Sequence, residues 1–179
     1  SVLWSKDENK MIDGVEIPSP KPSFGSKGEV EVDPNTYWSA LENTAGRLLE
    51  RHSKVEDLWL CTEMHGILVA NSSGDPITPY ISWRDGRGSF VGKNNLCTLD
   101  VLNDHSETFF SHSGMNFRAG LPIVTLSDLS RQQILPYDIR IFTLADWLLW
   151  KGGDRDPAVH PSLAAGTGFF DINSMQWSE

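Results

Sequence analysis

The segment Met64-His65-Gly66 ends a hydrophobic run and combines residue types that suit a ligand site. An imidazole can donate or accept a hydrogen bond, and a glycine lets a ligand approach the backbone closely. In α/β proteins ligands bind at strand ends, which is where we expect this segment to lie. The alternative is structural: a histidine that caps the strand end and bonds to a neighbouring group. These residues alone leave both interpretations open.

A second candidate site, Trp83-Arg84-Asp85-Gly86-Arg87, follows the next expected strand. An indole ring can cover the apolar C–H face of a sugar, and a carboxylate accepts protons from sugar hydroxyls. The combination therefore suits a carbohydrate. Taken alone, a packing Trp83 beside a surface ion pair of Asp85 with Arg87 is the stronger interpretation.

Other kinds of site are poorly supported by the residue pattern. Cys61, Glu63 and His65 alternate, so on a strand they would share one face, where a metal could bind. A second ligand group at a suitable spacing is lacking, so we predict no metal and interpret Cys61 as a buried small residue. Ser111-His112-Ser113 has no acid partner and no nucleophile elbow, and neither a G-x-G-x-x-G motif nor a Walker loop occurs.

Composition favours a small-molecule-binding domain. The chain has 179 residues, 39% of them hydrophobic, enough for one domain with a real core. With 15 Lys+Arg against 24 Asp+Glu the net charge is −9, which argues against nucleic acid or an anionic membrane as partners. The sequence contains no membrane-spanning apolar run and does not open with a basic-then-apolar leader. Two cysteines cannot make a disulfide scaffold, so we expect a cytoplasmic protein.

Strands and helices that could position these residues follow from apolar periodicity and turn residues. Strands are expected at Ser1–Trp4, Lys10–Ile17, Glu29–Val32, Asp57–Thr62, Gly66–Ala70, Ile77–Ser82 and Phe169–Ile172. Helices are expected from the N-cap Asp33 to near His52, and at Asp100–Phe110, Pro122–Gln133 and Ile139–Trp150. The inward face of the first helix should hold Tyr37, Leu41, Ala45, Leu48 and Leu49, and a core stripe should hold Leu144, Trp147, Leu148 and Trp150. Strands with one crossover helix, a helical insertion and a further strand indicate an α/β domain.

The order of these motifs resembles the FGGY family of carbohydrate kinases, and within it the xylulose kinases. Glu63-Met64-His65-Gly66 and then Trp83-Arg84-Asp85-Gly86-Arg87 resemble the pattern "QMHG … WNDGR". Upstream, Glu31-Val32-Asp33-Pro34 before Trp38 resembles "E-x-D-P-x-x-W".

Downstream the resemblance continues to the end of the chain. Ser113-Gly114 resembles the family's "TG" element. The run from Ser162 to Asp171, followed by Trp177, resembles its "S-x-A-x-x-T-G … D … W" strand. Three positions depart from the pattern: Glu63 replaces the usual Gln, Thr125 a frequent Lys, and His160 a frequent Asp. These departures bear on the substrate more than on the family.

The resemblance implies a fold of two ribonuclease-H-like lobes, as in actin and hexokinase, with sugar and ATP between them. Residues 1–179 would be part of the N-terminal, sugar-binding lobe, incomplete at both ends: a mixed sheet with flanking helices and a helical insertion. Carried over by position, the substrate-binding residues would be Met64, His65, Trp83 and Asp85. The pocket wall would include Glu63, Gly66, Arg87, Asn116 and Phe117.

Several family elements have no counterpart in this sequence. They are the phosphate-gripping "D-x-G-T" turn with its strand, the catalytic Asp, which would lie beyond the end of this chain, and the ATP-binding lobe. We therefore predict no catalytic residue within the chain and no kinase activity for the chain alone. ATP and Mg²⁺ would be bound by other parts of the parent. The missing first strand would lie between Ser1–Ser5 and Asp57–Thr62.

The function implied for the parent is ATP-dependent phosphorylation of a ketose or polyol hydroxyl. A pentulose such as xylulose or ribulose is favoured, because Met64-His65 stands where glycerol kinases have Arg-Glu. The alternative is a non-catalytic sugar-binding or regulatory module that retains this lobe. A homodimer is left open.

Overall fold

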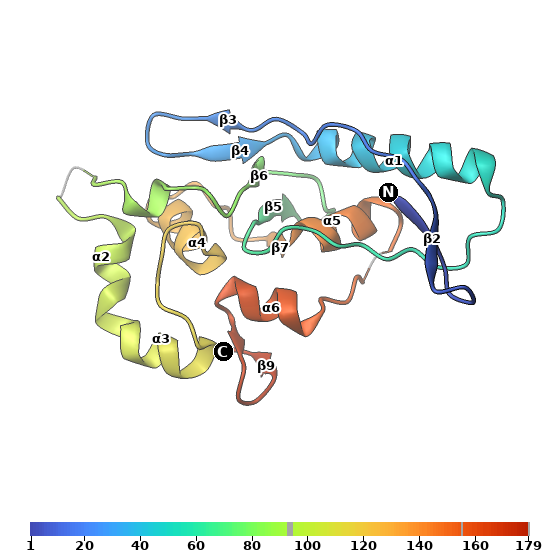
Figure 1. Ribbon diagram of the computed structural model, residues 1–179. Coiled ribbons are helices and arrows are strands. Elements are labelled where there is room, and N and C mark those ends of the chain that lie inside the picture. Colours follow the sequence, from blue (N-terminus) through green and yellow to red (C-terminus); the bar gives the residue numbers. More distant parts are fainter. Residues whose placement is uncertain (93–94, 155, 179) are drawn as a thin grey trace.

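The computed structural model describes residues 1–92, 95–154 and 156–178. Its strands are β1 (Val2–Ser5), β2 (Lys10–Gly14), β3 (Ser23–Phe24), β4 (Val30–Val32), β5 (Leu68–Asn71), β6 (Tyr80–Ile81), β7 (Ile139–Phe142), β8 (Phe170–Asp171) and β9 (Gln176–Trp177). Its helices are α1 (Pro34–Arg51), α2 (Thr98–Leu102), α3 (Ser106–Ser113), α4 (Pro122–Arg131), α5 (Leu144–Lys151) and α6 (Pro161–Thr167), with 3₁₀ helices η1 (Arg87–Ser89) and η2 (Asn103–His105). The mixture of helices and strands agrees with the predicted α/β class (Figure 1).

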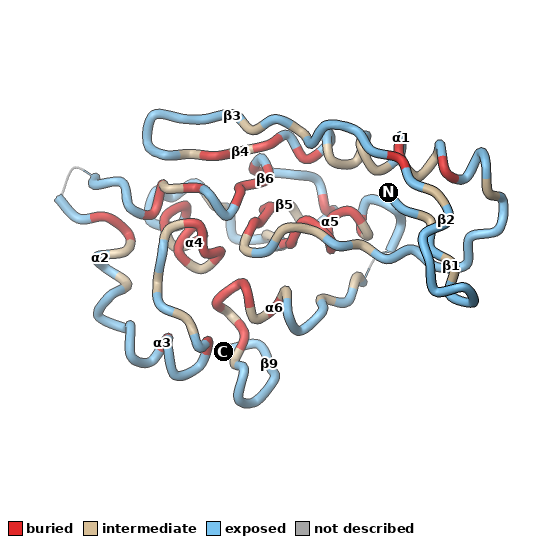
Figure 2. The backbone as a smooth tube through the Cα atoms, viewed as in Figure 1, coloured by how far each residue is buried: buried red, intermediate tan, exposed pale blue. Residues whose placement is uncertain are grey.

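The antiparallel pair β5–β7 lies at the centre of the molecule (Figure 1). Leu68 and Ala70 face the core cluster that includes α5 and is covered by α1, whereas Ile67 and Val69 face a second cluster that includes residues of α4. Both faces of β5 are thus covered, which explains its continuous apolar sequence. Figure 2 shows the buried residues concentrated in this region, with the β1–β2 hairpin largely exposed.

The described strands pair only in an antiparallel sense, as β1–β2, β3–β4–β6, β5–β7 and β8–β9. The parallel neighbours that a mixed sheet would contain are not found among these residues. Over the same described ranges, no helix is both long and apolar enough to cross a membrane.

Helix α1 begins and ends as predicted. The Asp33 carboxylate accepts a hydrogen bond from the Asn35 backbone N–H at 2.9 Å, and Pro34 occupies the first turn. Leu48 is buried, and Tyr37, Trp38 and Leu41 pack against the central core. The prediction for Leu49 was wrong: it is exposed, because it lies 100° around the helix from Leu48.

The prediction of one helix over Ile139–Trp150 was wrong for its first residues. Its first four residues form β7, and α5 begins only after Thr143. Thr143 and Asp146 form a capping box, in which the Asp146 carboxylate accepts from the Thr143 N–H at 3.2 Å. The predicted core stripe from Leu144 to Trp150 is confirmed.

The strand predicted at Asp57–Thr62 does not form. No described strand pairs with this segment, and of its apolar residues only Leu60 packs against the core, whereas Leu58 is 63% and Trp59 85% exposed. β1 pairs with β2, and not with this segment. An ion pair between Lys6 and Asp57 nevertheless holds the tip of the hairpin beside it.

Two other segments differ from their predictions. The helix predicted at Asp100–Phe110 is divided into α2, η2 and α3, with the division at the poor helix formers Asn103 and Asp104. The strand predicted at Ile77–Ser82 is reduced to β6, because Pro76 and Pro79 cannot donate to a ladder.

The Ser162–Gly168 run, which the resemblance places on a strand, forms α6 instead. His160 caps this helix: its Nδ1 accepts from the Ser162 backbone N–H at 3.2 Å. Pro161 occupies the first helical position. The strand, β8, begins only after the helix ends at Gly168.

Candidate functional site

A short antiparallel bridge between Ile67 and Ile81 brings the two predicted sugar-binding segments together. The end of this bridge at which His65 and Trp83 lie is called the open edge below. The Ile67 N–H donates to the Ile81 carbonyl at 3.0 Å, and the Ile81 N–H donates back at 2.8 Å. His65 lies two residues before Ile67 and Trp83 two residues after Ile81, both outside the strands. His65 and Trp83 therefore lie toward the same end of the bridge, whereas Asp85 and Arg87 turn back into the core.

His65 is held in an unusual backbone conformation by helix α6. Its φ is +65°, in the left-handed region, which costs a residue with a Cβ about 1–2 kcal/mol. The His65 Nδ1 lies 2.6 Å from the carbonyl oxygen of Gly166, a contact that spans 101 residues. A bond of this length to a group that can only accept explains how the strained turn is retained.

Two glycines allow the close packing around this turn. A Cβ at Gly66 would overlap the hydroxyl of Tyr80, so the Tyr80 ring fits only beneath a glycine. A Cβ at Gly166 would lie 3.2 Å from the Met64 Cε and 3.3 Å from the His65 Nδ1. Met64 and His65 are thus seated directly against α6, and Met64 remains 44% exposed.

Glu63 lies behind the turn, next to two tyrosines. The Tyr37 and Tyr80 rings meet edge-on, 5.4 Å between centroids. Burial first, and then the Glu63 charge, raises the pKa of Tyr80, and the same causes raise the pKa of Tyr37 to about 12. The Tyr80 hydroxyl is buried and completes no hydrogen bond with a described residue, although Glu63 is close enough to act on it. The half-buried Glu63 thus lies near the hydroxyls of both tyrosines.

Asp85 and Arg87 hold the second segment in place from inside. Asp85 is buried, and its Oδ2 accepts from the Val30 backbone N–H of β4 at 2.8 Å. Arg87 donates from Nε to the Asp85 Oδ1 at 2.8 Å and from Nη2 to the Glu31 Oε1 at 2.5 Å. Burial alone would lower the pKa of Arg87, but these bonds outweigh it and raise the pKa.

The ion pair of Asp85 with Arg87 therefore exists, but it is buried and not on the surface as predicted. The Asp85 carboxylate faces β4 and Arg87, where both oxygens are already bonded. In this arrangement Asp85 shapes the loop and does not reach the open edge, which is a correction to its predicted contact with substrate.

The other residues predicted to contact substrate or line the pocket differ in how accessible their side chains are. Trp83 is 47% exposed, and Gly120 lies directly against its carbonyl. Asn116, in the loop between α3 and α4, is exposed. The Phe117 ring stacks on Phe109 at 4.0 Å between centroids and packs against a buried cluster, so its faces are largely occupied.

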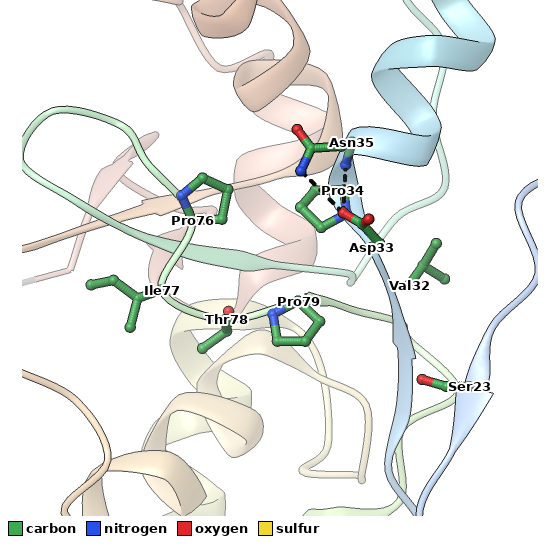
Figure 3. Close-up of a pocket in the computed structure, with 9 residues that line it drawn as sticks. All are labelled: Ser23, Val32, Asp33, Pro34, Asn35, Pro76, Ile77, Thr78 and Pro79. Atoms are coloured by element: carbon green, nitrogen blue, oxygen red, sulfur yellow. Dashed lines mark hydrogen bonds between the residues drawn. The ribbon is translucent and has the colours of Figure 1, made fainter.

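Two cavities lie away from this edge. One, of about 420 Å³, lies between the start of α1 and the loop before β6 (Figure 3); it is lined by Ser23, Val32, Asp33, Pro34, Asn35, Pro76, Ile77, Thr78 and Pro79. The other, of about 940 Å³, includes Arg87 in its wall but not Met64, His65 or Trp83. Neither cavity is lined by Met64, His65 or Trp83; of these, Met64 and Trp83 are exposed and His65 is half-buried.

The described residues do not fit a metal centre. They contain no group of three or more His, Cys, Asp or Glu side chains that could hold a metal ion. Cys61, Glu63 and His65 do not lie on a strand, and both cysteines are free, Cys61 exposed and Cys97 buried. We assign no step to Mg²⁺ or ATP within this chain.

Sequence reasoning missed three contributors to the site. Tyr37 and Tyr80 were assigned only to a helix face and a strand, and the Gly166 carbonyl belongs to the backbone. The available signal was indirect: Gly66 and Gly166 both stand in the quoted motifs, as glycines do where chain segments approach closely.

No family model matches the chain, but curated proteins do. It is 21% identical to a gluconokinase of Bacillus subtilis, over 83% of this chain and 29% of that protein. It is 26% identical to a xylulose kinase of Staphylococcus xylosus, over 84% and 31%, and 26% identical to a glycerol kinase of Cereibacter sphaeroides, over 84% and 32%. The chain spans about a third of the length of these relatives.

Solved structures show the same fold. A gluconate kinase from Lactobacillus acidophilus superposes with a TM-score of 0.81 at 18% identity, over 99% of this chain and 35% of that one. A xylulose kinase from Brucella ovis gives 0.82 at 20% identity, over 99% and 36%. The resemblance to FGGY-type carbohydrate kinases and the ribonuclease-H-like, actin-like ATPase fold predicted from it are confirmed.

Proposed function

We propose that residues 1–179 are part of the N-terminal, sugar-binding lobe of an ATP-dependent carbohydrate kinase that phosphorylates a ketose or polyol hydroxyl. A pentulose such as xylulose or ribulose is the favoured substrate, and the cytoplasm the favoured location. The parent protein would supply the phosphate turn, the catalytic Asp and the ATP-binding lobe.

The observation that carries the proposal is the contact of His65 with Gly166. It joins two segments 101 residues apart, each of which resembles a sugar-kinase motif independently of the other. A strained, left-handed histidine is more typical of a functional site than of a strand end. The bond to Gly166 is also what the structural alternative expects of a histidine that caps a strand end; the support for a ligand edge comes from the meeting of the two motif segments and from the left-handed backbone of His65.

The edge also has the chemistry that a sugar requires. Trp83 presents an exposed indole to C–H groups, His65 a ring nitrogen to a hydroxyl, and Met64 an adaptable apolar surface. The preference for a pentulose rests on Met64-His65, which occupies the Arg-Glu position of glycerol kinases. When bound in the parent, ATP would supply the phosphoryl group and Mg²⁺ would offset its charge; this chain's residues would hold and orient the acceptor.

The test is an ATP-coupled assay of the longer protein that contains this sequence, with xylulose, ribulose, gluconate and glycerol as acceptors. We expect turnover of a pentulose above the other three, and none with the purified 179-residue chain. Turnover by the chain alone would overturn the assignment of the catalytic parts to the rest of the parent. Sugar binding without phosphorylation would favour the non-catalytic module, and absence of both would overturn the proposal.

A further inference from the structure

We propose that His160 makes the support of the open edge sensitive to pH. The neutral imidazole of His160 caps helix α6, the helix that holds the turn at His65, and uptake of a proton by His160 removes this cap. The cap follows from contacts within the chain and does not depend on any ligand. Its effect on binding rests on the proposed function.

The first step is the protonation state that the cap requires. The Nδ1 of His160 lies 3.2 Å from the backbone nitrogen of Ser162 and 2.8 Å from the Ser162 Oγ. A backbone N–H can only donate, so Nδ1 accepts, and in the neutral ring the proton is on Nε2. A proton on Nδ1 would turn this acceptor into a donor that faces the Ser162 N–H, and the cap would be lost.

The second step is the charge at this end of the helix. The N-terminus of a helix carries a partial positive charge, which repels an imidazolium. Helix α6 has no acidic residue in its first turn to offset that repulsion. The folded chain therefore binds this proton less readily than the unfolded chain. The stabilisation by the cap is present above the pH of about 6.5 at which an imidazole ordinarily titrates, and it is lost as the pH falls below it.

Charged groups on the neighbouring elements do not replace the cap. Helix α6 packs against α4, β8 and the turn at His65, and an acidic loop precedes it. No ion pair joins His160 to any described residue of these segments. Their described titratable side chains are Glu63, His65, Asp128, Arg131, Asp154, Asp156 and Asp171.

Helix α6 depends on its cap more than a long helix would. It has seven residues, and its buried members are the small residues Ala164, Gly166 and Thr167. A short helix that buries little apolar surface is marginal without further support. The Gly166 carbonyl of this helix lies 2.6 Å from the His65 Nδ1. Loosening of α6 therefore loosens the long-range tie of the His65 turn as well.

Amide hydrogen exchange of the full chain tests the cap. In His160→Asn the side-chain amide oxygen can take the place of Nδ1, and this acceptor does not titrate. Near pH 7.5 we expect equal protection of the α6 amides in the wild type and this variant. Near pH 5.5 the wild type should be about fivefold less protected than the variant, as expected from the loss of a typical N-cap.

His105→Asn is the matched control. His105 is exposed, and its side chain caps no helix, so this change should leave the exchange of α6 at wild-type values at both pH values. His160→Ala, which has no acceptor, should show weak protection at both. A ratio of wild type to His160→Asn that does not change with pH would overturn the proposal. So would nitrogen NMR that finds a proton on the His160 Nδ1 near pH 7.5.

The effect on binding is measured in the longer protein, with xylulose, ribulose, gluconate and glycerol as probes. For a probe that binds, the dissociation constant of the wild type relative to His160→Asn should rise about two- to fivefold from pH 7.5 to 5.5. A constant ratio, with protection of α6 lost at the lower pH, would overturn the link between the cap and the open edge. Absence of binding by all four would overturn the proposed function and with it that link, while hydrogen exchange still decides the cap.

Discussion

The two segments that meet at the ligand edge are held by opposite means. Glu63–Gly66 is strained and partly open, and its long-range tie is a single imidazole bond to α6. Trp83–Arg87 is anchored by buried charges that bond to β4, and its exposed aromatic member is Trp83. Residues in one sequence motif can therefore be either contacts or supports, and burial distinguishes them. Changes at the more accessible side chains, His65 and Trp83, should alter binding, and changes at the buried Asp85 and Arg87 should alter folding.

The largest expected effect is the loss of a buried charge. Arg87→Ala leaves Asp85 buried without its partner, and such a loss costs about 3–5 kcal/mol of unfolding free energy. Arg84→Ala, an exposed arginine in the same loop, should change stability by less than about 0.5 kcal/mol. Urea unfolding of both variants measures this difference. Equal stabilities would mean that the buried pair does not support the loop.

The next effect concerns binding. In the longer protein, His65→Ala and Trp83→Ala should each weaken sugar binding by about 1–3 kcal/mol, through a lost hydrogen bond or a lost stacking surface. ATP affinity should stay near the wild-type value, because both side chains lie on the proposed sugar side. Calorimetric titration with the sugar and with ATP measures the two affinities separately. A fall in ATP affinity with sugar binding intact would contradict the placement of the site.

Local signals in the sequence predicted some elements well. Asp33 with Pro34 marks the start of α1, and the turn at Gly74 separates β5 from the following segment. Asp57–Thr62 was misassigned because a strand depends on a partner, and no local signal shows whether one is present. The helix predicted to begin at Ile139 begins only after Thr143. The prediction followed the apolar spacing and overlooked the capping box at Thr143, which is a local signal.

The candidate site was also predictable only where a residue carries a local signal. His65 and Trp83 carry chemistry in their own side chains, so residue type and order were enough to select them. The role of Asp85 depends on what surrounds it, and the Val30 N–H that it binds lies 55 residues away. The sequence could not show that this carboxylate points inward, and Gly166 acts through a carbonyl that every residue has.

A smaller effect would sharpen the contrast between the two segments. Tyr80→Phe removes a buried hydroxyl that completes no hydrogen bond with a described residue, so stability should stay constant or rise by up to about 1 kcal/mol. Thermal unfolding measures it, with Tyr37→Phe as the half-buried control. A clear loss of stability would show that Tyr80 bonds to Glu63, and that the first segment is also held by a buried polar network.

The smallest effect comes from a partly exposed ion pair, which serves as a reference for the buried one at Arg87. Asp13 in β2 accepts from the His52 Nε2 at 2.9 Å and the Arg51 Nε at 2.8 Å. These bonds, that of His52 first, lower the pKa of Asp13 from 3.8 to about 2. Because the folded-state pKa lies below the unfolded value, the stabilisation is fully present above pH 3.8 and is lost as the pH falls toward about 2. Asp13→Asn should therefore melt slightly below wild type near neutrality, and the two melting temperatures should converge in acid. A difference that persists or grows below pH 2 would show that Asp13 acts through its shape and not through its charge.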